Sequence, residues 1–160
     1  MKKLYDYFVS CISLDTHFTR FYHGNPNYVN CDIESMSFDD KMNTIETYFK
    51  NSNYIEIKLY YWEPDGLIQQ YIRNFNYDFL LLKSYKGRTK PGAVLISLRV
   101  MDVIFIRNLL FNHFNKDFSR NPYMEIRPYF LIQNQENVIV LEVYDDRGFN
   151  VFVESTLPSN

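Results

Sequence analysis

Hydrophobic residues recur along the chain with two different periods, and each period predicts a different kind of element. A spacing of three and four residues is typical of an amphipathic helix, because side chains at these intervals share one face. Ser35 or Ser37 can cap such a helix, since a serine hydroxyl accepts hydrogen bonds from the amides of the first turn. The pattern predicts helices over residues 2–13, Asp39–Lys50 and Met101–Phe114, and a short helix over Leu67–Phe75.

Strict alternation, which is typical of a strand, is clearest over Tyr54–Trp62. Glu56, Lys58 and Tyr60 fall on one face of this segment, and aliphatic residues occupy most of the other. The alternation therefore predicts a half-buried strand. Similar patterns predict further strands over His17–Tyr22, Tyr77–Tyr85, Ala93–Val100, Arg127–Gln133, Asn137–Tyr144 and Phe149–Ser155.

Turn residues separate these segments, as at Glu63–Gly66 and Asp145–Gly148. Short turns between strands favour antiparallel pairing, and the helices are interspersed among the strands. We therefore expect an α+β fold with a mainly antiparallel sheet and about three helices packed on it. A chain of 160 residues is the usual size of one domain, so residues 1–160 are predicted to form a single domain.

Composition narrows the classes of function. Hydrophobic residues make up 46% of the chain and charged residues 22%, as in globular proteins. The net charge of -2 argues against a nucleic-acid binder that relies on bulk positive charge. The N-terminus lacks the apolar stretch of a signal peptide, and no segment is apolar enough to span a bilayer. We expect a cytoplasmic protein without membrane contact, in which Cys11 and Cys31 are reduced.

Charged residues are unevenly distributed between the two halves of the sequence. Residues 1–80 carry 7 basic and 11 acidic side chains, and residues 81–160 carry 10 and 8. Such asymmetry is weak evidence for a polar binding face. The acidic excess includes Asp32, Glu34, Asp39, Asp40, Glu63 and Asp65, and the basic excess centres on Lys83, Lys86, Arg88 and Lys90.

Only one pair of residues is a candidate for catalysis. Glu56 and Lys58 lie two residues apart on one face of the predicted strand. A metal-dependent nuclease uses such a pair, with the carboxylate on the metal and the lysine near the attacking water. The alternative interpretation is an ion pair on a solvated face. The sequence contains no other catalytic arrangement, no metal-ligand spacing and no glycine-rich phosphate loop, so we predict no catalytic residues, metal or cofactor.

Two binding functions are also open. The segment Lys83–Lys90 has four positive charges around Tyr85, which is suitable for nucleic acid, although a solvated connection between strands explains it better. Aromatic residues make up 18% of the chain, and tyrosine and tryptophan are typical anchors of protein interfaces. We predict a partner-binding site for a basic protein, unless its aromatic members form a second, minor core. The predicted site consists of Asp39, Asp40, Tyr60, Trp62, Glu63 and Asp65.

The C-terminal third contains motifs that resemble those of a known protein family. Tyr144–Gly148 reads Y-D-D-R-G, and it follows an N-x-D-F segment at Asn115–Phe118 and a Y-F-L-I strand at Tyr129–Ile132. This arrangement resembles the C-terminal signature of a family of small uncharacterised bacterial proteins. The resemblance implies a stand-alone α+β protein like the immunity proteins that bacteria encode beside secreted toxins.

Each residue of Asp145–Gly148 also has a structural explanation. Asp145 can bond the amides of its own turn, Arg147 can pair with an acid on a neighbouring element, and Gly148 can adopt a positive φ to close a hairpin. We therefore interpret these four residues, Asp146 among them, as a structural turn.

The leading hypothesis is an immunity-type protein that binds and neutralises a toxin domain with a basic surface, without catalysis of its own. One alternative is a small metal-dependent nuclease or nucleic-acid-binding module that uses Glu56, Lys58 and the basic loop. A second alternative is a mobile-element inhibitor of a host protein, which binds by the same physics.

Overall fold

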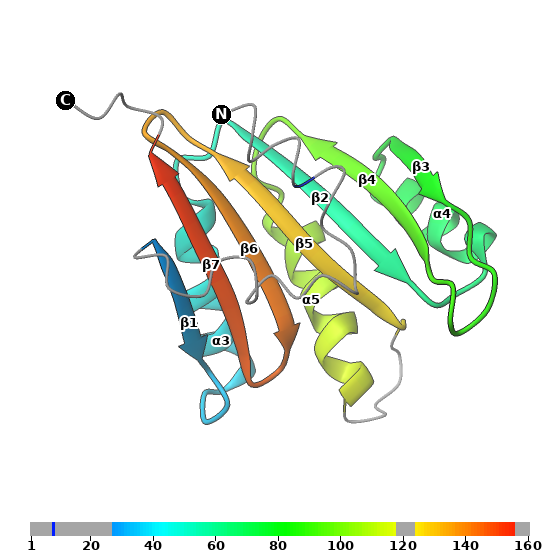
Figure 1. Ribbon diagram of the computed structural model, residues 1–160, viewed down its shortest axis with the longest axis horizontal. Coiled ribbons are helices and arrows are strands. Elements are labelled where there is room, and N and C mark those ends of the chain that lie inside the picture. Colours follow the sequence, from blue (N-terminus) through cyan, green and yellow to red (C-terminus); the bar gives the residue numbers. More distant parts are fainter. Residues whose placement is uncertain (1–7, 9–26, 118–123, 156–160) are drawn as a thin grey trace.

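The computed structural model describes residues 8, 27–117 and 124–155, and these form one antiparallel sheet with helices on one face (Figure 1). The order of the seven strands is β1-β7-β6-β5-β2-β4-β3, and every neighbouring pair is antiparallel. The predicted α+β class is therefore confirmed. The strands are β1 (Tyr28–Asp32), β2 (Tyr54–Tyr61), β3 (Phe79–Lys83), β4 (Gly92–Leu98), β5 (Ile126–Gln133), β6 (Asn137–Asp145) and β7 (Gly148–Ser155).

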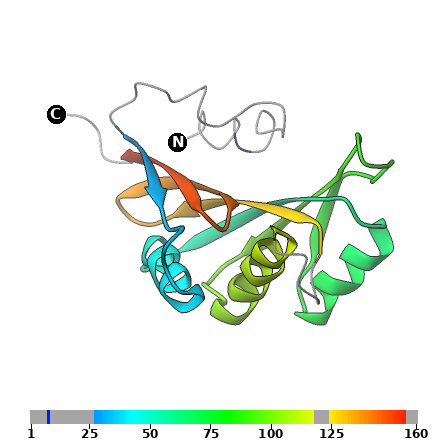
Figure 2. The same cartoon turned by 90° about the horizontal axis from the view of Figure 1, so that it is seen from below.

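Three α-helices of the described ranges lie in one layer beneath the sheet (Figure 2). They are α3 (Phe38–Glu46), which continues as a 3-10 turn (Thr47–Phe49), α4 (Asp65–Asn74) and α5 (Val103–Asp117). The Ser37 hydroxyl caps α3 by accepting a hydrogen bond from the Asp40 amide over 3.2 Å. None of the helices in the described part of the chain is long and apolar enough to cross a membrane.

The main core lies between the sheet and this helical layer. Ile55, Ile57 and Leu59 of β2 point toward the helices and are fully buried with Phe105 and Leu109 of α5. Burial of a side chain of this size stabilises the fold by about 1.5–3 kcal/mol. Ile106, Leu110 and Phe114, which recur at helical spacing along α5, lie in the same core and form its apolar stripe.

A second, smaller core covers the opposite face of the sheet. Phe8, Tyr60, Tyr129, Val140 and Phe152 belong to it, together with neighbouring aliphatic residues. The prediction of a half-buried β2 is therefore wrong. This strand lies between β4 and β5 in the interior of the sheet, and both of its faces are covered.

Several boundaries differ from the predicted ones. Helix α4 begins at Asp65, so the expected turn Glu63–Gly66 already contains its first two residues. Strand β1 was not predicted, because Tyr28–Asp32 alternates only weakly between apolar and polar side chains. The helix predicted over 2–13, apart from Phe8, and the strand predicted over 17–22 lie outside the described residues.

Candidate functional site

A groove of about 310 Å³ opens between the start of α3, the C-terminal half of α5 and the β6–β7 turn. It combines apolar side chains with acidic ones, and one lysine lies in its wall. We call this surface the acidic groove. The residues that line it are Glu34, Met36, Phe38, Lys41, Phe111, Phe114, Asn115 and Asp146.

Two aromatic rings form the apolar part of the acidic groove. Phe38 and Phe111 meet edge to face with 5.5 Å between their ring centroids. Their side chains are nevertheless 37% and 41% exposed, and Met36 beside them is 38% exposed. Adjacent exposed aromatic residues are typical anchors of protein interfaces, since their burial by a partner removes much apolar surface from water.

Acidic side chains line the groove or lie beside it in sequence. Glu34 and Asp146 line the groove, and the exposed Asp39 and Asp40 lie in the first turn of α3. Both aspartates stabilise the positive end of the helix dipole, and Asp40 also accepts a hydrogen bond from the Ser37 hydroxyl over 2.6 Å. Asp39 lies 3.8 Å from the Arg107 guanidinium. Both carboxylates remain at the surface, where Arg107 partly offsets the charge of Asp39 and Asp40 contributes to a negative field.

Lys41 is the only cation among the lining residues, and its charge is compensated within the wall. Its ammonium lies 3.6 Å from the Asp146 carboxylate and also donates a hydrogen bond to the Asp146 carbonyl. The side chain of Lys41 is 8% exposed and that of Asp146 is 16% exposed. This contact links α3 to the β6–β7 turn and leaves the groove without an exposed positive charge among its lining residues.

The Asp145–Gly148 turn is held by its own side chains. The Asp145 carboxylate accepts hydrogen bonds from the Arg147 amide over 2.8 Å and from the Arg147 Nε over 2.9 Å. Burial alone would raise the pKa of Asp145, but the guanidinium and amide of Arg147 outweigh it and lower the pKa. The predicted bond to the turn amide is thus confirmed. Arg147 pairs with an acid of its own turn, however, instead of one on a neighbouring element.

The prediction that Gly148 adopts a positive φ is wrong, since Gly87 is the only described glycine with that conformation. Gly148 is required instead for close packing. A Cβ atom on Gly148 would lie 2.0 Å from the Tyr144 hydroxyl and 2.7 Å from the Cys31 carbonyl oxygen. The residue therefore allows β1 and the tyrosine ring to approach the hairpin.

The other half of the predicted partner site lies away from Asp39 and Asp40. Trp62, Glu63 and Asp65 lie where β2 leads into α4, whereas α3 is at the opposite end of the helical layer (Figure 2). Antiparallel pairing brings the end of β2 next to β4 and β5, far from β1 and β7. The structure thus separates the six predicted residues into two groups.

Trp62 and Asp65 contact the basic loop that follows β3. The Trp62 Nε1 donates a hydrogen bond to the Arg88 carbonyl over 3.0 Å. The Asp65 carboxylate accepts hydrogen bonds from the Tyr61 hydroxyl over 2.7 Å and from the Tyr85 amide over 2.8 Å. Burial raises the pKa of Asp65, but these hydrogen bonds prevail and lower it. Both residues are therefore anchors of the loop within the chain.

Glu63 and Tyr60 also have internal roles. The Glu63 carboxylate accepts a hydrogen bond from the Glu125 amide over 3.0 Å and so fixes the segment before β5. Tyr60 is only 6% exposed and packs on Tyr129 in the second core. The prediction that Tyr60 faces a partner is therefore wrong, and the alternative of a second, minor core is correct for this residue.

Glu56 and Lys58 lie on the face of β2 that carries the second core and are 2% and 5% exposed. The Tyr54 hydroxyl donates to the Glu56 carboxylate over 2.6 Å, and the Lys58 ammonium lies 3.4 Å from the Phe8 carbonyl. A metal-dependent nuclease also needs a further acidic ligand upstream, but the nearest upstream aspartates, Asp39 and Asp40, belong to α3 on the other side of the sheet. Among the described residues no three His, Cys, Asp or Glu side chains form a metal-binding group.

Lys58 belongs to a polar row that crosses five strands in register and is buried except at Asn30, on the edge strand β1. The row runs through Asn30, Asn150, Glu142, Tyr129 and Lys58. The side-chain amide of Asn150 donates a hydrogen bond to one carboxylate oxygen of Glu142 over 3.0 Å. The Arg127 guanidinium donates to the other oxygen over 2.8 Å. Burial, together with the Glu142 charge, raises the pKa of Tyr129.

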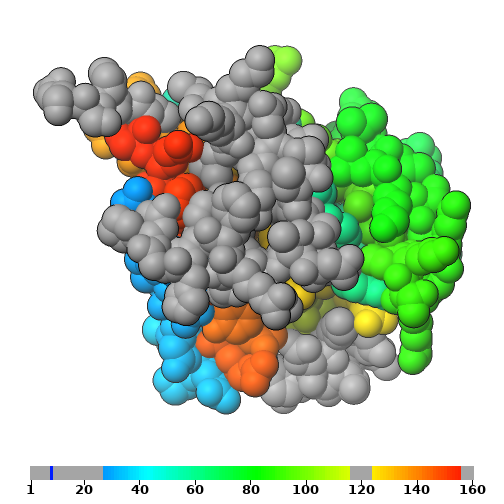
Figure 3. All heavy atoms as spheres, in the orientation of Figure 1, coloured from blue at the N-terminus to red at the C-terminus, as the bar shows by residue number. Residues whose placement is uncertain are grey.

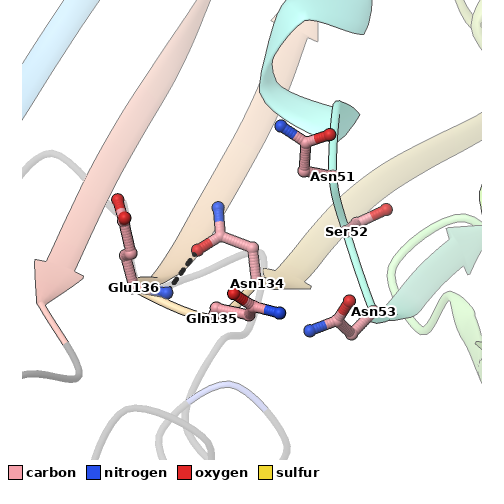
Figure 4. A pocket seen from close by; sticks show the side chains of 6 residues that line it. All are labelled: Asn51, Ser52, Asn53, Asn134, Gln135 and Glu136. Atoms are coloured by element: carbon pink, nitrogen blue, oxygen red, sulfur yellow. Dashed lines mark hydrogen bonds between the residues drawn. The ribbon is translucent and has the colours of Figure 1, made fainter.

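A second hollow, of about 460 Å³, lies at one end of the sheet between the loop before β2 and the β5–β6 hairpin (Figure 4). Its side chains are mainly carboxamides, and those of Asn53 and Gln135 point toward one another. Carboxamides hydrogen-bond with many classes of ligand, so this lining does not select one. The lining residues are Asn51, Ser52, Asn53, Asn134, Gln135 and Glu136.

No protein-family model, curated protein sequence or solved structure matches the chain. The acidic groove is therefore interpreted from its own residues. Sequence reasoning included Asp39 and Asp40 but did not assign Glu34, Met36, Phe38 or Phe111 to a site. One signal was present for Phe111, which falls outside the apolar stripe of α5 and is therefore directed away from the main core.

Proposed function

We propose that the chain is a non-catalytic protein-binding domain whose acidic groove binds a basic surface of a partner protein. The observation that carries this proposal is the exposed pair Phe38 and Phe111, which lies among Glu34, Asp39 and Asp40. An apolar centre with a charged rim is the usual arrangement of an interface. The aromatic rings would supply affinity, and the carboxylates would steer a cationic partner.

The proposed partner is a toxin domain, so the protein would act as an immunity-type inhibitor that occludes it. The resemblance of Tyr144–Gly148 to the immunity-like family supports this partner class. The position of the motif supports it as well, because Asp146 lines the acidic groove. A mobile-element inhibitor would use the same groove on a host protein, and identification of the partner distinguishes the two.

The test begins with capture of partners by the tagged full chain from its native cells, followed by purification of a stoichiometric protein. We expect a basic protein that is harmful when expressed alone and harmless when co-expressed with this chain. We expect Phe111→Ser and Glu34→Lys each to weaken the measured affinity by about tenfold or more. Ile104→Ser is the matched control, since Ile104 is 74% exposed at the start of α5 and outside the groove.

Salt dependence is the second readout of this experiment. Affinity should fall as salt rises, because exposed charges at the groove are screened. Glu34→Lys should flatten this dependence, whereas Phe111→Ser should leave the slope unchanged. Unchanged binding by both groove variants, or co-purification of nucleic acid in place of protein, would overturn the proposal.

A further inference from the structure

Strand β3 forms one border of the sheet, and its outer edge pairs with no strand of the described ranges. Three consecutive leucines occupy it: Leu80, Leu81 and Leu82 are 61%, 41% and 37% exposed. Figure 3 shows this end of the sheet, in green, at the rim of the molecule. An edge strand has unpaired main-chain groups, and an apolar edge strand favours pairing with another strand.

The opposite border of the sheet is different. Strand β1 has the sequence Tyr-Val-Asn-Cys-Asp, and Val29 is its only exposed large hydrophobic residue. Asn30 and Asp32 make this edge polar, which discourages association. The leucine run is therefore a property of one edge only.

The charges at the two ends of β3 indicate which strand fits it. Asp78 immediately precedes the strand and Lys83 ends it, and both residues are exposed. They lie roughly 17 Å apart along an extended strand, so they do not pair with each other within one chain. In an antiparallel pair, however, the start of one strand lies beside the end of the other. The segment Asp78–Lys83 is thus complementary to a second copy of itself.

We propose that two copies of this chain pair antiparallel through β3, so that the sheet continues across a symmetric dimer. A two-fold axis perpendicular to the sheet keeps each side chain on its own face. Pairing centred on Leu81 then places Leu80 opposite Leu82 of the second copy, and Asp78 opposite its Ser84 and next to its Lys83. Strand β3 has only five residues and a register shift after Leu81, so the interface is small and the affinity micromolar.

Sedimentation velocity of the full chain tests the dimer over a range of about 1 to 300 µM, where micromolar association is visible. We expect a monomer–dimer equilibrium. Leu81→Lys should weaken it by at least about tenfold, because two like charges would meet at the axis. Ile104→Lys is the control and should leave the equilibrium unchanged, since Ile104 lies on α5. Circular dichroism of both variants verifies that they are folded.

A charge exchange tests the antiparallel arrangement itself. Asp78→Lys and Lys83→Asp should each weaken the dimer, because each places like charges together across the interface. The double variant should restore it, and an equimolar mixture of the two single variants should form a heterodimer more readily than either forms a homodimer.

A monomer throughout the concentration range overturns the proposal, as does a dimer that is insensitive to these changes or a mixture without heterodimers. The proposal is independent of the acidic groove, so Glu34→Lys should leave the dimer intact. Failure of one proposal therefore does not imply failure of the other.

Discussion

Lys41 and Asp146 are 105 residues apart in sequence, yet they join α3 to the β6–β7 turn through two contacts. Lys41 donates a hydrogen bond to the main-chain carbonyl of Asp146, and its ammonium forms an ion pair with the carboxylate at 3.6 Å. Lys41→Met should therefore cost about 2–3 kcal/mol of unfolding free energy, since it leaves a largely buried carboxylate and a carbonyl without this donor. Asp146→Asn should cost about 1 kcal/mol, because the contact with the carbonyl survives. Urea unfolding measures both values, and the reverse order would contradict this assignment.

The Asp145 carboxylate should make stability depend on pH. Its pKa is lowered in the folded protein, so it stabilises the fold above its unfolded pKa of about 3.9. This contribution is lost as the pH falls through the folded pKa. Asp145→Asn should therefore reduce the unfolding free energy by about 1 kcal/mol at pH 7, and the difference should disappear once the pH is below the folded pKa of Asp145. Glu136→Gln, at an exposed acid of the β5–β6 hairpin, is the control.

Two glycines should respond to alanine with opposite signs. Gly148→Ala should cost about 2 kcal/mol or more, because the new Cβ would overlap Tyr144 and the Cys31 carbonyl. Gly66→Ala should stabilise the protein by about 0.5–1 kcal/mol, since the site in α4 has open space and alanine favours the helix. Thermal and urea unfolding of both variants provide the comparison. Equal effects would show that the contacts around Gly148 are not restrictive.

The loop after β3 should open more often when its internal anchor is removed. Trp62→Phe retains a ring but deletes the donor to the Arg88 carbonyl, which contributes about 1 kcal/mol. Trypsin should then cleave after Lys86 or Arg88 about fivefold faster, because cleavage follows the population of the open loop. Tyr77→Phe removes a hydrogen bond to Asp102 elsewhere and should leave this rate unchanged. Equal acceleration by both variants would indicate a global effect.

Periodicity identified the described helices and most strands, because local spacing determines which side chains share a face. The helical spacing of Val103, Ile106, Leu110 and Phe114 predicted the inward face of α5, and the last three are buried. Val103, the first residue of the helix, is 41% exposed. Periodicity failed to show that β2 is covered on both sides, since burial of Lys58 and Tyr60 depends on strand order and on Phe8. Local spacing contains no information about which segments lie above a strand.

The candidate site was harder to predict than the fold. Trp62 and Asp65 combine residue types that interfaces use, but those types are equally suited to anchoring a loop. Their partners, the Arg88 carbonyl and the Tyr85 amide, are main-chain groups that no sequence pattern reveals. The groove depends on contacts such as the one between Phe38 and Phe111, which only the packing of α3 against α5 creates.

The polar row across the sheet also limits how the sheet can assemble. Asn30, Asn150, Glu142, Tyr129 and Lys58 meet only when all five strands have one alignment. A shift of any strand by one residue would move its polar member to the helix side, where it would interrupt the main core. Misaligned sheets are therefore penalised strongly during folding. Aliphatic residues in this row would leave several alignments nearly equal in energy, and the polar side chains thus select one sheet from many.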